Sequence, residues 1–331
     1  MLGLQDRLLH DRNNSQRYRF NRAKHIAMNR TNSQAVLTTG FMFAIGSAAL
    51  FAIRPIFVKL VYAQGIDPTT LIAFRMLFSA PIYAIILVLL LRAPERRALL
   101  STKAVISSAI IGLFGYYAAS FFDLIGLQYV TAQLGRMILY VYPTMVVILG
   151  VLFFKEKVNL RMFISLTITY IGVAMIFGHD LDQFGSEVYT GALFILASAL
   201  SFSIYLIFSK TLITEIGSQV FTCIALIAAS IGIFIHYALT RSVVSPEVNA
   251  QGLFWILVIA IFCTVIPTFF TTSAVARIGA NKTGVVSMIG PAFTSTFAIL
   301  ILSETFTVYH AIGIVMTVSG VWYLHREKLK T

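Results

Sequence analysis

The sequence predicts an all-α membrane protein whose ten transmembrane helices form two inverted five-helix repeats. Three observations lead to this fold class: an apolar composition, ten apolar runs of spanning length and an internal repeat. Of the 331 residues, 58% are hydrophobic and 11% are charged, and the mean hydropathy is +0.85. Because soluble domains carry about 25% charged residues, this composition indicates that the bilayer is the solvent.

Ten apolar windows follow one another along the chain, each with roughly the 20 residues that a spanning helix needs. They cover residues 37–58, 69–91, 104–122, 128–154, 160–178, 189–208, 219–239, 253–275, 280–302 and 307–324. Such helices satisfy their own backbone hydrogen bonds, as hydrocarbon requires. The third and fourth windows are barely separated, between Asp123 and Val130. The tails, 1–35 and 326–331, are polar and basic, and the run at 37–58 is expected to be an uncleaved anchor.

The distribution of Lys and Arg predicts the orientation of these spans. With the N-terminus in the cytoplasm, 20 of the 25 Lys and Arg residues fall in cytoplasmic segments, and the outer segments hold only Lys59 and Arg241. The outer segments carry acidic residues instead, including Asp180 in a predicted loop at 178–187. The positive-inside rule then predicts a multi-pass protein of the inner (plasma) membrane with both termini in the cytoplasm. Since this topology accounts for the net charge of +12, no nucleic-acid partner is expected.

Residues that commonly form catalytic or metal sites are sparse. Cys223 and Cys263 lie in apolar runs, where a thiol behaves as a small buried hydrophobe. The six histidines show no HExxH spacing, and no GxxxxGK[ST] nucleotide loop is present. The sequence therefore predicts no cofactor, no metal and no enzymatic activity. A membrane-embedded enzyme acting on lipid-linked substrates is the alternative from another functional class.

An internal repeat relates the two halves of the chain. The 23-residue segments that begin at Leu37 and Val188 are identical at ten positions, including the shared glycine Gly40/Gly191. Further along, a second block aligns at an offset of 148 residues. Each repeat contains five predicted spans, and an odd number obliges the second copy to enter the membrane upside down. Inverted repeats are typical of secondary transporters, whose two near-equivalent packings give inward-open and outward-open states.

The second block contains a pattern that occurs once in each half. The pattern A-x(10)-P-x(12)-E runs through Ala132, Pro143 and Glu156 and again through Ala280, Pro291 and Glu304, each time followed by a glycine, Gly172 or Gly320. It resembles the EamA-type domain of the drug/metabolite transporter superfamily. The resemblance implies two repeats, at 36–178 and 188–325, a central cavity between the halves, and transport of metabolites such as amino acids, nucleosides or drugs.

Two residue types in this pattern suggest specific roles. Pro143 and Pro291 are expected in mid-helix, where proline removes a backbone hydrogen bond and bends the helix. The freed carbonyl then either faces the cavity and contacts substrate, or simply accompanies a static packing kink. Glu156 and Glu304 precede the fifth and tenth spans, where a carboxylate can cap exposed N–H groups. We favour this capping role over a role in proton coupling.

Four charged residues lie within or at the end of the predicted spans. Arg54, Arg75 and Arg136 are expected in the outer half of the membrane, and Asp123 at the outer end of the third span. A charge in hydrocarbon costs about 2.5–3.5 kcal/mol, so such residues normally face a cavity or a partner. The second repeat carries no charge at the equivalent positions, so the fold is two-fold symmetric while the charge is not.

These observations predict a site for an anionic or zwitterionic substrate, because Arg binds carboxylate and phosphate in bidentate fashion. The predicted substrate-binding residues are Arg54, Arg75, Arg136, Asp123, Tyr140, Pro143 and Pro291. The alternative for the charged residues is an outer gate, or a structural pairing of Arg75 or Arg136 with Asp123. The alternative for Tyr140 and the neighbouring tyrosines is a role in packing or in the interfacial aromatic belt.

The sequence as a whole predicts a secondary transporter that exports an amino acid or related small metabolite by alternating access. An exchanger of phosphorylated solutes or nucleotide sugars is the second interpretation, favoured by the arginine cluster. The expected partners are the small-molecule substrate and the lipid bilayer, and the prediction allows a homodimer.

Overall fold

The computed structural model describes residues 36–155, 160–240 and 248–325, and these residues are mostly helical with no β-strand among them. The two basic tails, the residues Glu156 and Arg241, and most of the connection after the seventh span lie outside the described part of the chain. Within it, nine helices are long and apolar enough to cross a membrane, and a tenth, shorter apolar helix covers Val308–Tyr323. The chain is therefore an all-α, ten-span membrane protein.

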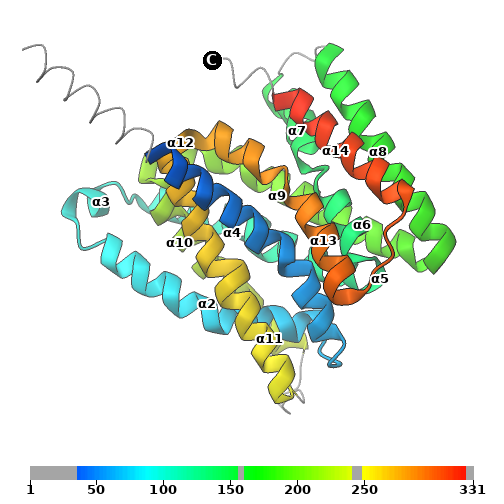
Figure 1. Ribbon diagram of the computed structural model, residues 1–331. Helices are drawn as coiled ribbons and strands as arrows, with labels where there is room; N and C mark the ends of the chain where they lie inside the picture. The colour runs from blue at the N-terminus through cyan, green and yellow to red at the C-terminus, as the bar shows by residue number, and fades with distance from the viewer. Residues whose placement is uncertain (1–35, 156–159, 241–247, 326–331) are drawn as a thin grey trace, which may run out of the picture.

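The elements follow the order of the predicted windows (Figure 1). The first helix covers Val36–Tyr62. The others are α2 (Pro68–Leu90), α3 (Pro94–Ala98), α4 (Thr102–Gly112), the π-helical turn η1 (Leu113–Ala118), α5 (Ala119–Tyr129), α6 (Ala132–Leu139), α7 (Tyr142–Phe154), α8 (Leu160–Phe184), α9 (Glu187–Ile216), α10 (Ser218–Thr240), α11 (Ala250–Ala260), the π-helical turn η2 (Ile261–Val265), α12 (Ile266–Ser287), α13 (Gly290–Leu302) and α14 (Val308–His325). The third span comprises α4, η1 and α5, and the fourth comprises α6 and α7.

Two predicted boundaries were wrong in ways that matter for the site. The third span continues to Tyr129, so Asp123 lies six residues, or about 9 Å, inside the helix rather than at its end. The fifth span continues to Phe184, so Asp180 is helical and buried rather than part of a loop. In both cases the predicted span stopped at a polar residue, whereas the helix continues and the carboxylate finds a partner within the protein: Asp123 pairs with Arg54, and Asp180 accepts from Thr131.

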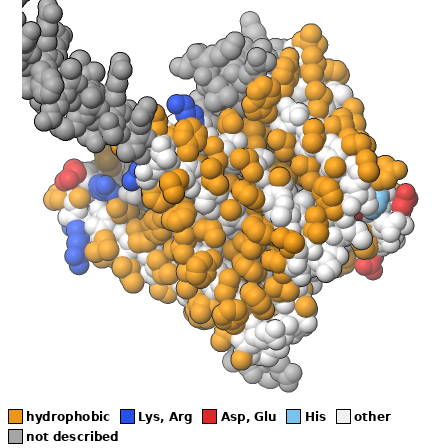
Figure 2. Space-filling view, viewed as in Figure 1, with side chains coloured by type: hydrophobic (Ala, Val, Ile, Leu, Met, Phe, Trp, Pro, Cys, Tyr) orange, Lys and Arg blue, Asp and Glu red, His pale blue; other side chains and the backbone are white. Residues whose placement is uncertain are grey.

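Most of the surface around the spans is apolar, as a lipid-facing surface must be. Figure 2 shows hydrophobic side chains over much of the visible face, with Lys and Arg toward the left, beside an acidic side chain, and with further acidic side chains and His at the right edge. Leu160, Leu239 and Leu300 are among the most exposed hydrophobic residues, at 74%, 81% and 74%. In water such a surface would drive aggregation, whereas in hydrocarbon it costs nothing.

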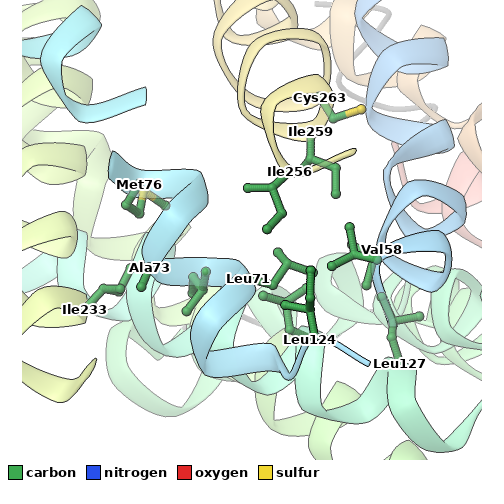
Figure 3. Close-up of a cluster of buried hydrophobic side chains, with 13 residues drawn as sticks. Val58, Leu71, Ala73, Met76, Leu124, Leu127, Ile233, Ile256, Ile259 and Cys263 are labelled. Atoms are coloured by element: carbon green, nitrogen blue, oxygen red, sulfur yellow. The ribbon is translucent and has the colours of Figure 1, made fainter. Parts of the chain in front are cut away.

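A buried apolar cluster joins the first helix to α2, α5 and α11 (Figure 3). Val58, Leu71, Leu124 and Ile256 are fully buried in it, and Cys263 of η2 packs at its edge. Both cysteines are free and buried, in agreement with their predicted role as small hydrophobes. This cluster fixes the first two spans against the third and eighth.

Symmetric contacts between the two halves reproduce the internal repeat. α8 and α14 lie side by side (Figure 1) and cross at a glycine from each. A Cβ on Gly172 would lie 2.6 Å from Thr317 Oγ1, and a Cβ on Gly320 would lie 2.4 Å from Thr169 Oγ1. Thr169 and Thr317, like the two glycines, are 148 residues apart. The fifth and tenth spans thus exchange the same contact, which is the relation expected of a two-fold axis between repeats.

The irregular parts of the helices are also repeated. The π-helical turns η1 and η2 begin at Leu113 and Ile261, again 148 residues apart. The fourth span is interrupted just before Tyr142, and the ninth is interrupted just before Gly290. π-Helical turns and interrupted helices are concentrated at functional sites. Their symmetric placement therefore indicates a functional site at the centre of the molecule, between the two repeats.

Candidate functional site

A cavity of about 460 Å³ lies where these irregular segments meet. This volume is within the range of roughly 300–1,000 Å³ that small-molecule sites occupy. Its lining comes from the first helix, α2, the η1 turn with α5, the break between α6 and α7, α9, α10, η2 with α12, and the start of α13. Both repeats therefore contribute to one central chamber.

The charged residues that line the cavity are the four singled out in the sequence: Arg54, Arg75, Arg136 and Asp123. Arg54 and Asp123 form an ion pair, and their side chains are 17% and 6% exposed. The alternative pairing of Arg75 or Arg136 with Asp123 was wrong, because the deeper position of Asp123 on α5 brings it to the first helix instead. One arginine is neutralised in this way and two remain in surplus.

The two surplus arginines are held in different environments. Arg75 on α2 is 2% exposed, and Arg136 on α6 donates to the backbone carbonyl of Phe51 at 2.6 Å. Within the described residues, the Nε atoms of Arg54, Arg75 and Arg136 are buried without a hydrogen-bond partner. A buried donor without an acceptor costs about 1–3 kcal/mol.

The two prolines lie at the helix breaks, but in a different position from the one predicted. Pro143 and Pro291 each occupy the first turn of a new helix, where a missing N–H is tolerated, rather than the middle of a continuous one. Neither proline lines the cavity, although Tyr142 and Gly290 beside them do. The prolines thus position the start of each half-helix next to the chamber.

Tyr140 connects the two breaks. Its hydroxyl donates to the backbone carbonyl of Ser287. In a continuous helix that carbonyl would accept from residue 291, which is a proline and has no N–H. The equivalent carbonyl of the first repeat is that of Leu139, four residues before Pro143; it accepts no hydrogen bond from any other described residue and belongs to a residue that lines the cavity.

In the second repeat, the positions equivalent to Arg54 and Asp123 carry hydroxyl side chains. Tyr205, the counterpart of Arg54, pairs its hydroxyl with that of Tyr116 at 3.0 Å. Thr271, the counterpart of Asp123, pairs with Ser47 at 2.6 Å. Neutral hydroxyl pairs on one side and an ion pair on the other make the chamber electrostatically one-sided.

Glu304 caps a helix, although not the helix that the sequence suggested. Its carboxylate oxygens accept from the backbone N–H groups of Ala132 and Gln133, at 2.8 and 3.3 Å. These groups open α6 in the other repeat, whereas capping of the tenth span was expected. A residue of the second repeat thereby holds the N-terminal end of the fourth span.

Several lining residues were not assigned to the cavity by the sequence. Thr222, Thr264, Thr268 and Ser287 line it alongside the tyrosines. Their side chains are short hydroxyls within apolar runs, which resemble ordinary helix-packing residues. The 148-residue offset that aligns η1 with η2 relates three of them, Thr264, Thr268 and Ser287, to the lining residues Tyr116, Ser120 and Leu139 of the first repeat.

The comparisons with known proteins agree with this architecture. The model of the EamA-like transporter family matches the chain twice, over residues 38–178 and 189–325. An uncharacterised transporter of Bacillus subtilis (strain 168), YcbK, is 26% identical over 300 residues, covering 88% of this chain and 94% of that protein. A solved crystal structure superimposes with a TM-score of 0.62 at 16% identity, over 89% of this chain and 99% of the other, which shows the shared fold. The chain belongs to the EamA-like transporter family.

Proposed function

We propose that the protein is a secondary transporter that exports an anionic or zwitterionic small metabolite, with amino acids as the first candidates, across the plasma membrane by alternating access. The observation that carries the proposal is a central chamber, built by both repeats at their helix breaks, that holds two arginines in surplus over its one acid. Membership of a transporter family supports the function class, and the chemistry of the chamber supports the substrate class.

The acidic group of a substrate has a defined place in this chamber. Arg75 and Arg136 present guanidinium groups whose Nε atoms lack a partner. In a site of low dielectric constant, a carboxylate is attracted strongly by two uncompensated cations and can be bound in bidentate fashion. The start of α7 adds to this attraction, because the N-terminal end of a helix carries a partial positive charge.

The amino group of a zwitterion also has a complementary partner. The carbonyl of Leu139 ends α6, accepts no hydrogen bond among the described residues and belongs to the cavity lining. A helix C-terminus carries a partial negative charge, which favours a cation. Carboxylate and ammonium groups would therefore lie at opposite sides of the break before Tyr142, within one small chamber.

Alternating access is supported by the symmetry of the irregular helix segments. Each repeat has one π-helical turn and one broken span, related by the same 148-residue offset. Two such sets in opposite orientation can open the chamber to either side by rocking of one repeat against the other.

Counterflow in proteoliposomes tests the proposal. Labelled amino acids, organic phosphates and nucleosides are offered in turn to vesicles preloaded with the unlabelled solute. We expect saturable exchange of an amino acid, and we expect Arg136→Gln to abolish it because the substrate carboxylate loses a ligand. Arg277→Gln is the matched control, since Arg277 is exposed outside the chamber and binds the Ser273 carbonyl and the Phe43 ring.

Two results would contradict this function. Exchange that is unchanged in Arg136→Gln, with the variant folded, would refute the site. Turnover of a lipid-linked substrate without solute movement would favour a membrane enzyme over a carrier.

An exchanger of phosphorylated solutes is the second candidate, and the surplus of two cations favours it because a phosphate group carries up to two negative charges. The same panel separates the two candidates: exchange of an organic phosphate without exchange of any amino acid would favour the exchanger.

A further inference from the structure

A second cluster of polar residues lies away from the chamber, where the fifth and tenth spans meet near the ends of α8 and α14. His179 and Asp180 are neighbours near the C-terminal end of α8, and His310 is in the first turn of α14. The Asp180 Oδ1 atom lies 3.4 Å from His179 Nδ1 and 3.5 Å from His310 Nε2. Two imidazoles and a carboxylate thus converge on one point.

We propose that His179, Asp180 and His310 bind a divalent transition-metal ion, for which Zn²⁺ is the representative. The donor set is the reason for this class of ion, because imidazole nitrogen suits zinc and its first-row neighbours whereas Mg²⁺ and Ca²⁺ prefer oxygen ligands. Two histidines and one carboxylate form a known zinc ligand set, in which water completes the tetrahedron.

The distances match the geometry that the ion requires. Zinc is bound at about 2.0–2.1 Å by His nitrogen and about 2.0–2.2 Å by carboxylate oxygen, so the edges of a tetrahedral site are about 3.3 Å. The two measured edges are 3.4 and 3.5 Å. The three candidate ligand atoms, one from each residue, all lie within 4.8 Å of one another. Little rearrangement is needed to bring them to one ion.

A second shell of hydrogen bonds orients two of the three ligands. The other carboxylate oxygen of Asp180 accepts from the Thr131 hydroxyl at 2.7 Å, and His310 Nδ1 lies 2.9 Å from the Thr307 hydroxyl and accepts from the Thr307 backbone N–H at 3.3 Å. Metal binding through Nε2 places the ring proton on Nδ1, which then donates to the Thr307 hydroxyl and no longer accepts from the backbone N–H. Metal-bound histidines and carboxylates almost always have such outer partners, which fix their orientation.

The burial of the cluster argues against a merely solvated group of charges. The side chains of Asp180 and His310 are each 1% exposed, while that of His179 is 12% exposed and provides a route for an ion. Under the predicted orientation this end of the bundle faces the outside. The ion would join α8 to α14 and, through Asp180 and Thr131, hold the start of α6.

Zinc titration of the full-length protein in detergent, after treatment with a chelator, tests the site. We expect one Zn²⁺ per chain at this site, a raised thermal midpoint on saturation because only the folded state contains the site, and affinity at least about 100-fold weaker in His179→Ala. His179 is the most exposed ligand, so its replacement leaves the buried Asp180 and His310 pair in place. Cobalt(II) provides a second readout through the visible absorption bands of a tetrahedral N/O site.

His236→Gln is the matched control, because His236 is also a helical histidine and pairs with the Tyr117 hydroxyl at 2.9 Å, away from the cluster. Its zinc affinity and cobalt spectrum are expected to equal those of the unmodified protein. Equal binding by His179→Ala and His236→Gln would show that the metal binds elsewhere. Absence of stoichiometric binding by the unmodified protein would reduce the cluster to a hydrogen-bonded contact and overturn the proposal.

Discussion

At the scale of single residues, the chamber is defined by groups whose usual partners are missing. Proline at 291 leaves the Ser287 carbonyl without its helical donor, and Tyr140 from the other repeat supplies one. The second repeat has no equivalent tyrosine, because Met288 occupies the position related to Tyr140, so the Leu139 carbonyl of the first repeat has no such donor among the described residues. One tyrosine therefore satisfies one break, and in the proposed mechanism the other break is left for the substrate.

Replacing Tyr140 with Phe tests this division at the residue scale. We expect the free energy of unfolding to fall by about 1–3 kcal/mol, since the Ser287 carbonyl is then buried without a donor. Thermal denaturation in detergent measures the change. Tyr170→Phe is the control, because Tyr170 on α8 is 40% exposed and faces outward. An equal effect of the two substitutions would show that the Tyr140 hydroxyl has no special role.

At the scale of helices, the sequence predicted the spans well and their interruptions less well. Hydropathy detects a run of apolar residues, and the π-helical turn η1 has the same apolar composition as the helix around it. The continuation of α8 to Phe184 was missed because His179 and Asp180 resemble loop residues until their tertiary partners are known. Glu304 was correctly expected to cap a helix, but only the packing of the two repeats shows that the helix is α6.

Close packing of α8 against α14 gives a prediction at the element scale. Gly172→Ala places a Cβ within 2.6 Å of Thr317 Oγ1 and 2.7 Å of the Gly313 carbonyl, so we expect a loss of about 1–3 kcal/mol in thermal unfolding. Gly178→Ala in the same helix meets no atom within 4 Å. It is expected to be neutral or stabilising, by up to about 1 kcal/mol from helix propensity. The reverse order of the two variants would mean that the helices do not cross at Gly172.

At the scale of the whole molecule, the proposed transport mechanism requires two repeats that cross the membrane in opposite directions. The same 148-residue offset relates the π-helical turns, the helix breaks and the glycine contacts between α8 and α14. The sequence could predict this symmetry because duplicated residues keep their spacing. It could not predict which charges pair, because pairing depends on how deep each residue lies once the spans are packed.

Labelling of matched single cysteines measures the inversion most directly. Tyr129 and Arg277 are both exposed and occupy equivalent positions, at the ends of the third and eighth spans. In a background where Cys223 and Cys263 are replaced by Ala, we expect Tyr129→Cys in intact cells to react with a membrane-impermeant maleimide. We expect Arg277→Cys to react only after the membrane is permeabilised. Reaction of both positions from the same side would contradict the inverted repeat and, with it, the proposed transport mechanism.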